Sequence, residues 1–125
     1  MAVIITYHPS KHVIWAEYLP PLLGEDFTKR FEETRAYYDQ AEFDLIAVSD
    51  FSHIKKLPPN ALISAISASR LKHSKQNCTI FITSGPIQHK LMELYISITR
   101  RSDIVICVTP QEAWEKVDKI LASTT

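Results

Sequence analysis

Glycine and cysteine are scarce in this chain. Of its 125 residues only Gly24 and Gly85 are glycines, and only Cys78 and Cys107 are cysteines. A phosphate-binding loop needs several glycines within a few residues, so two distant glycines exclude a nucleotide-binding loop of that kind. Each cysteine lies in an apolar segment without a neighbouring histidine or basic residue that would activate its thiol. We therefore expect two buried, free thiols and no thiolate nucleophile.

The chain also lacks an excess of charge and a long apolar segment. Fourteen lysines and arginines balance fourteen aspartates and glutamates, which leaves no long-range field to attract nucleic acid or an acidic membrane. The longest apolar runs, such as residues 104–108, fall far short of the roughly 20 residues of a membrane span. Residues 1–6 lack the basic region and apolar core of a secretory signal. We expect a cytoplasmic protein that neither binds nucleic acid nor inserts into a membrane.

Hydrophobic periodicity predicts one domain over residues 1–125, built from five strands and four helices. Alternating or continuous apolar residues predict strands at 3–7, 12–18, 43–48, 78–83 and 104–108. Apolar residues at helical spacing predict helices at 25–41, 61–71, 87–101 and 110–121. Proline and polar residues at 9–11 predict the turn of a hairpin, and Thr109-Pro110-Gln111-Glu112 is typical of a capping box at the last helix.

The predicted order of elements is ββαβαβαβα. Strands that alternate with helices pair in parallel through right-handed crossovers, whereas the first strand runs antiparallel to its hairpin partner. This order predicts an α/β fold with a mixed five-stranded sheet and four helices that cover it. The segment 43–48 is almost wholly apolar, which indicates a central strand covered on both faces.

Two segments carry a resemblance to a known family. Residues 45–54 read Leu-Ile-Ala-Val-Ser-Asp-Phe-Ser-His-Ile. They are similar to the third strand of STAS/SpoIIAA-like proteins and the Asp-Leu-Ser-Gly-Val type segment that follows it, with His53 in place of the usual glycine. Residues 104–121 resemble the last strand and closing helix of the same family. The resemblance implies a SpoIIAA-like/STAS-like fold and a non-enzymatic regulatory or protein-interaction role.

The chain departs from this family at its best understood switch. In the anti-sigma-factor antagonists an Asp-Ser-Ser-Gly motif opens the second helix, and a partner kinase phosphorylates its second serine. The matching positions are Pro58, Pro59, Asn60 and Ala61, none of which can accept phosphate as that serine does. The resemblance therefore implies a divergent member without this switch.

Asp50 also invites comparison with the phosphoacceptor of response-regulator receivers. A receiver needs an acidic pair after its first strand and a lysine before a later proline. Here the first predicted strand ends in Tyr7-His8, and Thr109 stands at the lysine position. We do not expect phosphoacceptor chemistry at Asp50.

The carboxyl ends of the parallel strands are the expected place for a binding site in such a fold. The predicted ligand-binding residues at this edge are Asp50, Ser52, Ser84, Gly85 and Thr109. Backbone amides at the helix starts there could bind a phosphate or a carboxylate. The same residue types also form caps and turns, so a purely structural role stays open.

A second place for a ligand lies under the first predicted helix. Phe27, Phe31, Tyr37, Tyr38 and Trp15 are numerous enough to line a pocket between that helix and the sheet, although core packing also explains them. Because Tyr37 and Tyr38 are adjacent on a helix, only one of them can face inward.

No metal or other cofactor is expected. The five histidines are scattered along the chain, and only His8 and His12 lie close in sequence. No cysteine, aspartate or glutamate beside them completes a zinc-binding set.

The sequence favours a non-enzymatic, STAS-like regulatory or interaction module. Its partner would be another protein or a second copy of the chain, because the edge strand of the hairpin must be covered unless Lys11 and His12 blunt it. The alternative is a small-molecule or lipid-binding domain with a pocket at the carboxyl ends of the strands or under the first helix.

Overall fold

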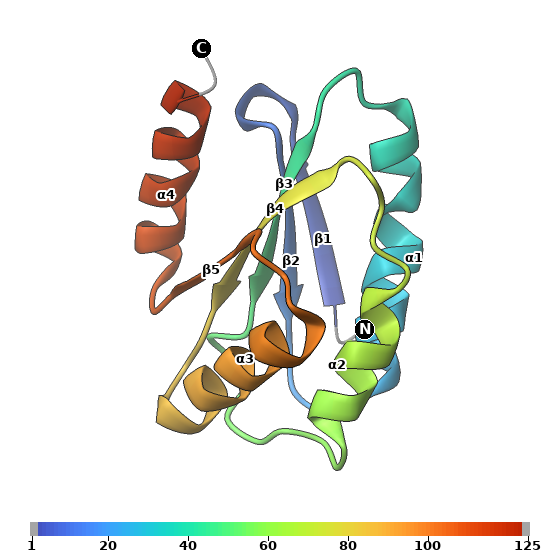
Figure 1. Cartoon of the computed structure of the whole chain (residues 1–125), viewed down its shortest axis with the longest axis vertical. Coiled ribbons are helices and arrows are strands. Elements are labelled where there is room, and N and C mark those ends of the chain that lie inside the picture. Colours follow the sequence, from blue (N-terminus) through green and yellow to red (C-terminus); the bar gives the residue numbers. More distant parts are fainter. Residues whose placement is uncertain (1–2, 124–125) are drawn as a thin grey trace.

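The computed structural model describes residues 3–123 and contains the predicted elements in the predicted order (Figure 1). The strands are β1 (Val3–His8), β2 (Val13–Tyr18), β3 (Leu45–Asp50), β4 (Gln76–Ile82) and β5 (Ile104–Cys107). The α-helices are α1 (Glu25–Gln40), α2 (Ala61–Ser69), α3 (Pro86–Thr99) and α4 (Pro110–Ser123). A short 3-10 turn, η1 (Pro9–Lys11), joins β1 to β2. Within residues 3–123, none of the helices has the length and apolar character that a membrane span requires.

The five strands form one mixed sheet in the spatial order β1-β2-β3-β4-β5. β1 pairs antiparallel with β2, with Val3 opposite Tyr18 and His8 opposite Val13. The pairs β2–β3, β3–β4 and β4–β5 are all parallel. The predicted α/β class, mixed sheet and order ββαβαβαβα are thus confirmed.

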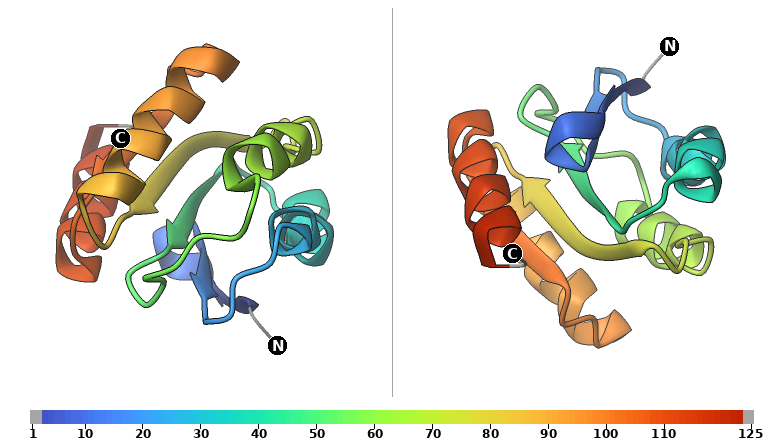
Figure 2. Two further views of the ribbon diagram at one scale, coloured as in Figure 1. Left: turned by 90° about the horizontal axis from the view of Figure 1, so that it is seen from below. Right: turned by 90° about the horizontal axis from the view of Figure 1, so that it is seen from above.

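Three helices cover one face of the sheet and one helix covers the other. Each of α1, α2 and α3 connects neighbouring parallel strands, and right-handed crossovers place such helices on the same face. α4 follows the last strand and packs against the opposite face, so it lies across the sheet from α1 and α2 in both views of Figure 2. The sheet is therefore a middle layer with a distinct apolar core on each side.

Alternation along the strands assigns side chains to these two cores. Ala16 and Phe81 pack in the core under α1–α3, whereas Val48, Ile80 and Ile82 pack in the core under α4. All six residues of β3 are buried. This confirms the prediction of a central strand that is covered on both faces.

Local signals set the turn and the helix starts where the sequence predicts them. His12 adopts the left-handed region at φ 56° and closes η1, with its backbone N–H donating to the Pro9 carbonyl at 3.2 Å. At α4 the Thr109 hydroxyl oxygen accepts the backbone N–H of Glu112 at 3.1 Å, which is the first half of the predicted capping box. The Glu112 side chain also interacts with the Cys107 thiol and raises its pKa.

Several predicted boundaries and faces are wrong. β3 begins at Leu45, because Phe43 lies outside the sheet and stacks on His12 with 3.7 Å between the ring centroids. α2 ends at Ser69 instead of residue 71, and two of the apolar residues in the predicted helix, Ile63 and Leu71, are 65% and 46% exposed. α2 packs between α1 and α3, and apolar side chains on its outer side stay in solvent.

We expect Ile80→Ala to lower the free energy of unfolding by about 3 kcal/mol, because it leaves a cavity in the core under α4. Ile80 is fully buried in the middle of β4. Denaturant unfolding followed by tryptophan fluorescence measures the change. The control Ile63→Ala truncates an exposed side chain and should change stability by less than about 0.5 kcal/mol. Equal effects of the two variants would contradict the assignment of the core.

Candidate functional site

The five residues predicted to bind a ligand at the carboxyl ends of the strands are engaged in turns and caps. Asp50 is buried, and its Oδ1 accepts the backbone N–H of Ser52 at 2.9 Å. The Ser84 hydroxyl donates to the carbonyl of Ile54 at 2.7 Å. Gly85 precedes α3, and Thr109 caps α4. Each side chain or backbone position thus has a structural role at this edge.

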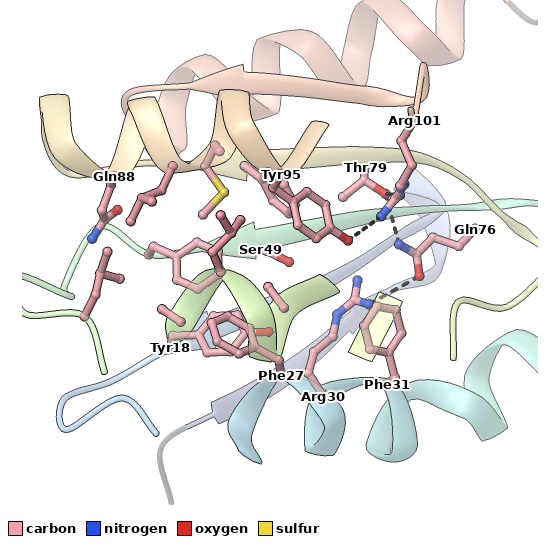
Figure 3. A pocket seen from close by; sticks show the side chains of 18 residues that line it. Tyr18, Phe27, Arg30, Phe31, Ser49, Gln76, Thr79, Gln88, Tyr95 and Arg101 are labelled. Carbon is pink, nitrogen blue, oxygen red and sulfur yellow. Dashed lines mark hydrogen bonds between the residues drawn. The ribbon is translucent and has the colours of Figure 1, made fainter. Parts of the chain in front are cut away.

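A cavity lies elsewhere, between the sheet and helices α1, α2 and α3 (Figure 3). It holds about 700 Å³ between its lining atoms, the open mouth included, and about 60 Å³ of this can hold the centre of a water molecule. The lining is mainly aromatic and aliphatic. It comprises Tyr18, Phe27, Arg30, Phe31, Ser49, Phe51, Leu57, Ala61, Leu62, Ala65, Gln76, Thr79, Phe81, Gln88, Leu91, Met92, Tyr95 and Arg101. None of the five predicted ligand-binding residues is among them.

Small side chains account for the open space. Ser49 of β3 faces the cavity from the floor of the sheet, and Ala61 and Ala65 face it from α2. Gly24, just before α1, allows a close approach to α2, since a Cβ there would lie 2.7 Å from the Ser64 Oγ atom. The two helices therefore stand close together over a floor that their short side chains do not fill.

One end of the cavity is polar. Gln76 and Thr79 are both 1% exposed on β4, and Gln76 Nε2 donates to Thr79 Oγ1 at 2.9 Å. Gln76 Oε1 accepts hydrogen bonds from Tyr38 Oη and Arg30 Nη1, each at 3.3 Å. Figure 3 shows Arg30 and Arg101 at this end, with Gln88 at the opposite end. The cavity is thus amphipathic along its length.

Arg101 is neutralised and fixed by its neighbours. Its Nε donates to Asp103 Oδ1 at 2.9 Å, its Nη2 to Thr79 Oγ1 at 2.9 Å and its Nη1 to Tyr95 Oη at 3.1 Å. Burial alone would lower the pKa of Arg101, but the hydrogen bond to Asp103 keeps it above its ordinary value. Burial likewise opposes the charge of Asp103, yet the bond from Arg101 holds its pKa below the usual range. The pair is a structural clamp at the edge of the cavity.

Arg30 differs from Arg101 because much of its hydrogen-bonding capacity is unused. The residue is 2% exposed, and its guanidinium lies 4.5 Å from the centroid of the Phe31 ring. Nη1 donates to Gln76 and the Tyr38 phenol also interacts with the guanidinium, whereas the buried Nε and Nη2 atoms have no hydrogen-bond partner among residues 3–123. Buried polar atoms are nearly always hydrogen-bonded, so this arrangement is unusual.

Burial keeps one phenol and the two thiols of the cores in their neutral forms. Burial raises the pKa of the Tyr18 phenol, which lines the cavity, to about 12. Burial also raises the pKa of Cys78, and together with Glu112 it raises that of Cys107 to about 11. Both cysteines are free; Cys107 is buried as predicted, whereas Cys78 is only partly buried. A raised pKa disfavours the thiolate, which is the nucleophilic form of cysteine. Neither cysteine is therefore activated as a nucleophile.

Only part of this cavity was predicted from the sequence. Phe27 and Phe31 line it, but Trp15 lies on the other face of the sheet, stacked on Trp114. Tyr38 is buried and Tyr37 is 38% exposed, which confirms that only one of them faces inward.

Arg30 was not among the predicted residues, although its position offers a signal. It lies on the inward stripe of α1, one residue before Phe31 and four before the buried Thr34. A charged residue on a stripe that otherwise faces the core is a candidate for a functional role.

The histidines form no metal site. His53 contacts Glu17 at 3.1 Å and His73 contacts Asp39 at 2.8 Å, while His12 stacks on Phe43. Among residues 3–123, no three histidine, cysteine, aspartate or glutamate side chains are grouped so that they could hold a metal ion.

Comparison with known proteins gives no relative: no protein-family model matches the chain, and no curated protein matches its sequence. The class of protein is therefore defined by the fold and the cavity alone. The chain is an α/β protein with a mixed sheet and an internal cavity that is apolar along most of its length and cationic at one end.

Proposed function

We propose that this protein binds a small, mainly apolar molecule in the cavity between the sheet and α1–α3. The observation that carries the proposal is the cavity itself, whose walls come from β2, β3, β4 and three helices. Ligand sites are typically concave and chiefly apolar, with a few polar groups that orient the ligand. Phe27, Phe51 and Phe81 supply the apolar surface, and Arg30 and Gln76 supply the polar groups.

The lining supports binding without catalysis. Its side chains in the described part of the chain include no carboxylate, histidine or cysteine. The groups that could exchange a proton are phenols, and that of Tyr18 has a pKa of about 12, far from neutral pH. General acid–base catalysis works best with groups that titrate near the operating pH. A carrier or sensor of a small ligand is the function that this lining favours.

Ala65→Leu should weaken ligand binding by about tenfold or more, because the larger side chain occupies the cavity. Ala65 lies on α2 and lines the cavity. Benzyl alcohol and 3-methylbutan-1-ol serve as neutral probes, with affinities from changes in amide NMR shifts. In the wild-type protein these changes should concentrate on β3, β4 and α2.

The matched control is Ser67→Leu, which adds the same side chain on the exposed side of α2. Its affinity for both probes should equal that of the wild type. Shift changes confined to the outer surface, or equal affinities in the two leucine variants, would contradict the proposed function.

A STAS-like relationship remains a separate proposal, and the order of elements is its support. Asn60 stands before α2, at the position that the resemblance gives to the phosphorylated serine, and lies in the left-handed region at φ 60°. A regulatory role for this chain would therefore act through another signal. Occupancy of the cavity is the signal that the proposed function offers.

A further inference from the structure

The unused edge of the Arg30 guanidinium has a defined geometry. In arginine, Nε–H and one N–H of Nη2 lie side by side and point in the same direction. This edge binds the two oxygens of a carboxylate through two parallel hydrogen bonds. In Arg30 these two atoms, Nε and Nη2, are the ones that are buried without a partner among residues 3–123, while Nη1 donates to Gln76. The unpaired edge is therefore one whose geometry matches a carboxylate.

The charge of Arg30 is also uncompensated. No ion pair within 4.0 Å joins it to an acidic side chain of residues 3–123. Asp26, one turn earlier on α1, accepts the backbone N–H of Leu23 at 2.8 Å. Asp103 is bound to Arg101. A buried charge without a partner is costly, and an anionic ligand would remove that cost.

The surroundings limit the ligand to one negative charge and a compact body. Because Asp103 already neutralises Arg101, the polar end has one positive charge to offer, which suits a carboxylate better than a phosphate dianion. Beyond Arg30 the cavity is bordered by Phe27, Phe51 and Met92. The space inside the cavity suits a short molecule better than a long acyl chain.

We infer that the ligand is a small monocarboxylate with an aromatic or short aliphatic body. Its carboxylate accepts hydrogen bonds from Nε–H and Nη2–H of Arg30, and its apolar body lies against the phenylalanines of the cavity. This inference rests on the proposed function and adds the chemical class of the ligand.

Benzoate and benzamide test this inference, since they have nearly the same shape and differ in charge. Isothermal titration and amide NMR shifts give their affinities for the wild type, Arg30→Met and Arg35→Met. The wild type should bind benzoate about ten- to one-hundredfold more tightly than benzamide, as expected for a charge-assisted, bidentate contact. Arg30→Met should lose this preference and keep its affinity for benzamide.

Arg35→Met is the matched control, because Arg35 is exposed on the same helix. It should keep the preference of the wild type for benzoate. Equal binding of benzoate and benzamide by the wild type would overturn the inference and leave the proposed function standing. A benzoate preference that survives in Arg30→Met would also overturn it. If neither benzoate nor benzamide binds, and the two neutral alcohols do not bind either, the proposed function is contradicted as well.

Discussion

Arg30→Met should raise the free energy of unfolding of the ligand-free protein by about 1–3 kcal/mol, because it replaces a buried charge that has no ion-pair partner within residues 3–123 by an apolar side chain of similar length. The substitution removes a 3.3 Å hydrogen bond from Nη1 to Gln76. Gln76 Oε1 keeps the hydroxyl of Tyr38 as a donor, so no new unpaired acceptor results. Urea unfolding followed by the fluorescence of Trp15 and Trp114 measures the difference.

This prediction separates a ligand-binding arginine from a structural one. A group kept for binding costs stability when the ligand is absent, whereas a structural group contributes to it. Arg35→Met again serves as the control and should change the free energy of unfolding by less than about 0.5 kcal/mol. If Arg30→Met unfolds at lower urea concentration than the wild type, Arg30 stabilises the fold and the inference from its unused donors is wrong.

Asp103→Asn should have the opposite effect and lower the free energy of unfolding by about 2–3 kcal/mol. The Arg101 and Asp103 side chains are only 10% and 18% exposed, so the substitution leaves a mostly buried guanidinium without its counter-charge. Asp118→Asn is the matched control. Asp118 pairs with Lys11 at 2.9 Å, but these side chains are 60% and 48% exposed, and such pairs contribute little. Equal losses in the two variants would contradict the assigned role of Asp103.

The effect of Asp103→Asn should also depend on pH. Folding lowers the pKa of Asp103 below its ordinary value of 3.8, so the folded protein holds the ionised form to lower pH than the unfolded chain does. The resulting stabilisation is complete above pH 3.8 and is lost as the pH falls through the folded pKa. The difference between wild type and variant should therefore be constant near neutral pH and shrink below about pH 4. If the difference in free energy of unfolding between wild type and variant grows in acid, the pKa of Asp103 is not lowered by folding.

Most of the fold could be predicted because it depends on local patterns. Apolar alternation in β1 and β2, the continuous apolar run of β3 and the capping residue Thr109 each act within a few residues. Boundaries were less accurate where a tertiary contact decides them. Phe43 reads as part of a strand, but its ring packs on His12 outside the sheet.

The predicted ligand-binding residues and the cavity lie at different places in the fold. The residues chosen at the carboxyl ends of the strands, such as Asp50 and Ser84, are polar at the expected place and form local turns and loop contacts. The cavity exists because small side chains leave space unfilled. A sequence does not show which small residues will face one another in the fold. Ser49 and Ala65 are far apart in the chain and leave space only because α2 packs over β3.

The sequence by itself determined the α/β class, the order of the elements, the hairpin, the buried central strand and the start of α4, because each depends on short-range periodicity or capping. The tertiary structure alone decided that Arg30 enters an apolar cavity with two of its nitrogen atoms, Nε and Nη2, unpaired within residues 3–123. Whether a charged side chain on an inward helix face finds partners depends on distant residues. Here Gln76, which lies 46 residues away in the chain, accepts a hydrogen bond from one of the three guanidinium nitrogen atoms.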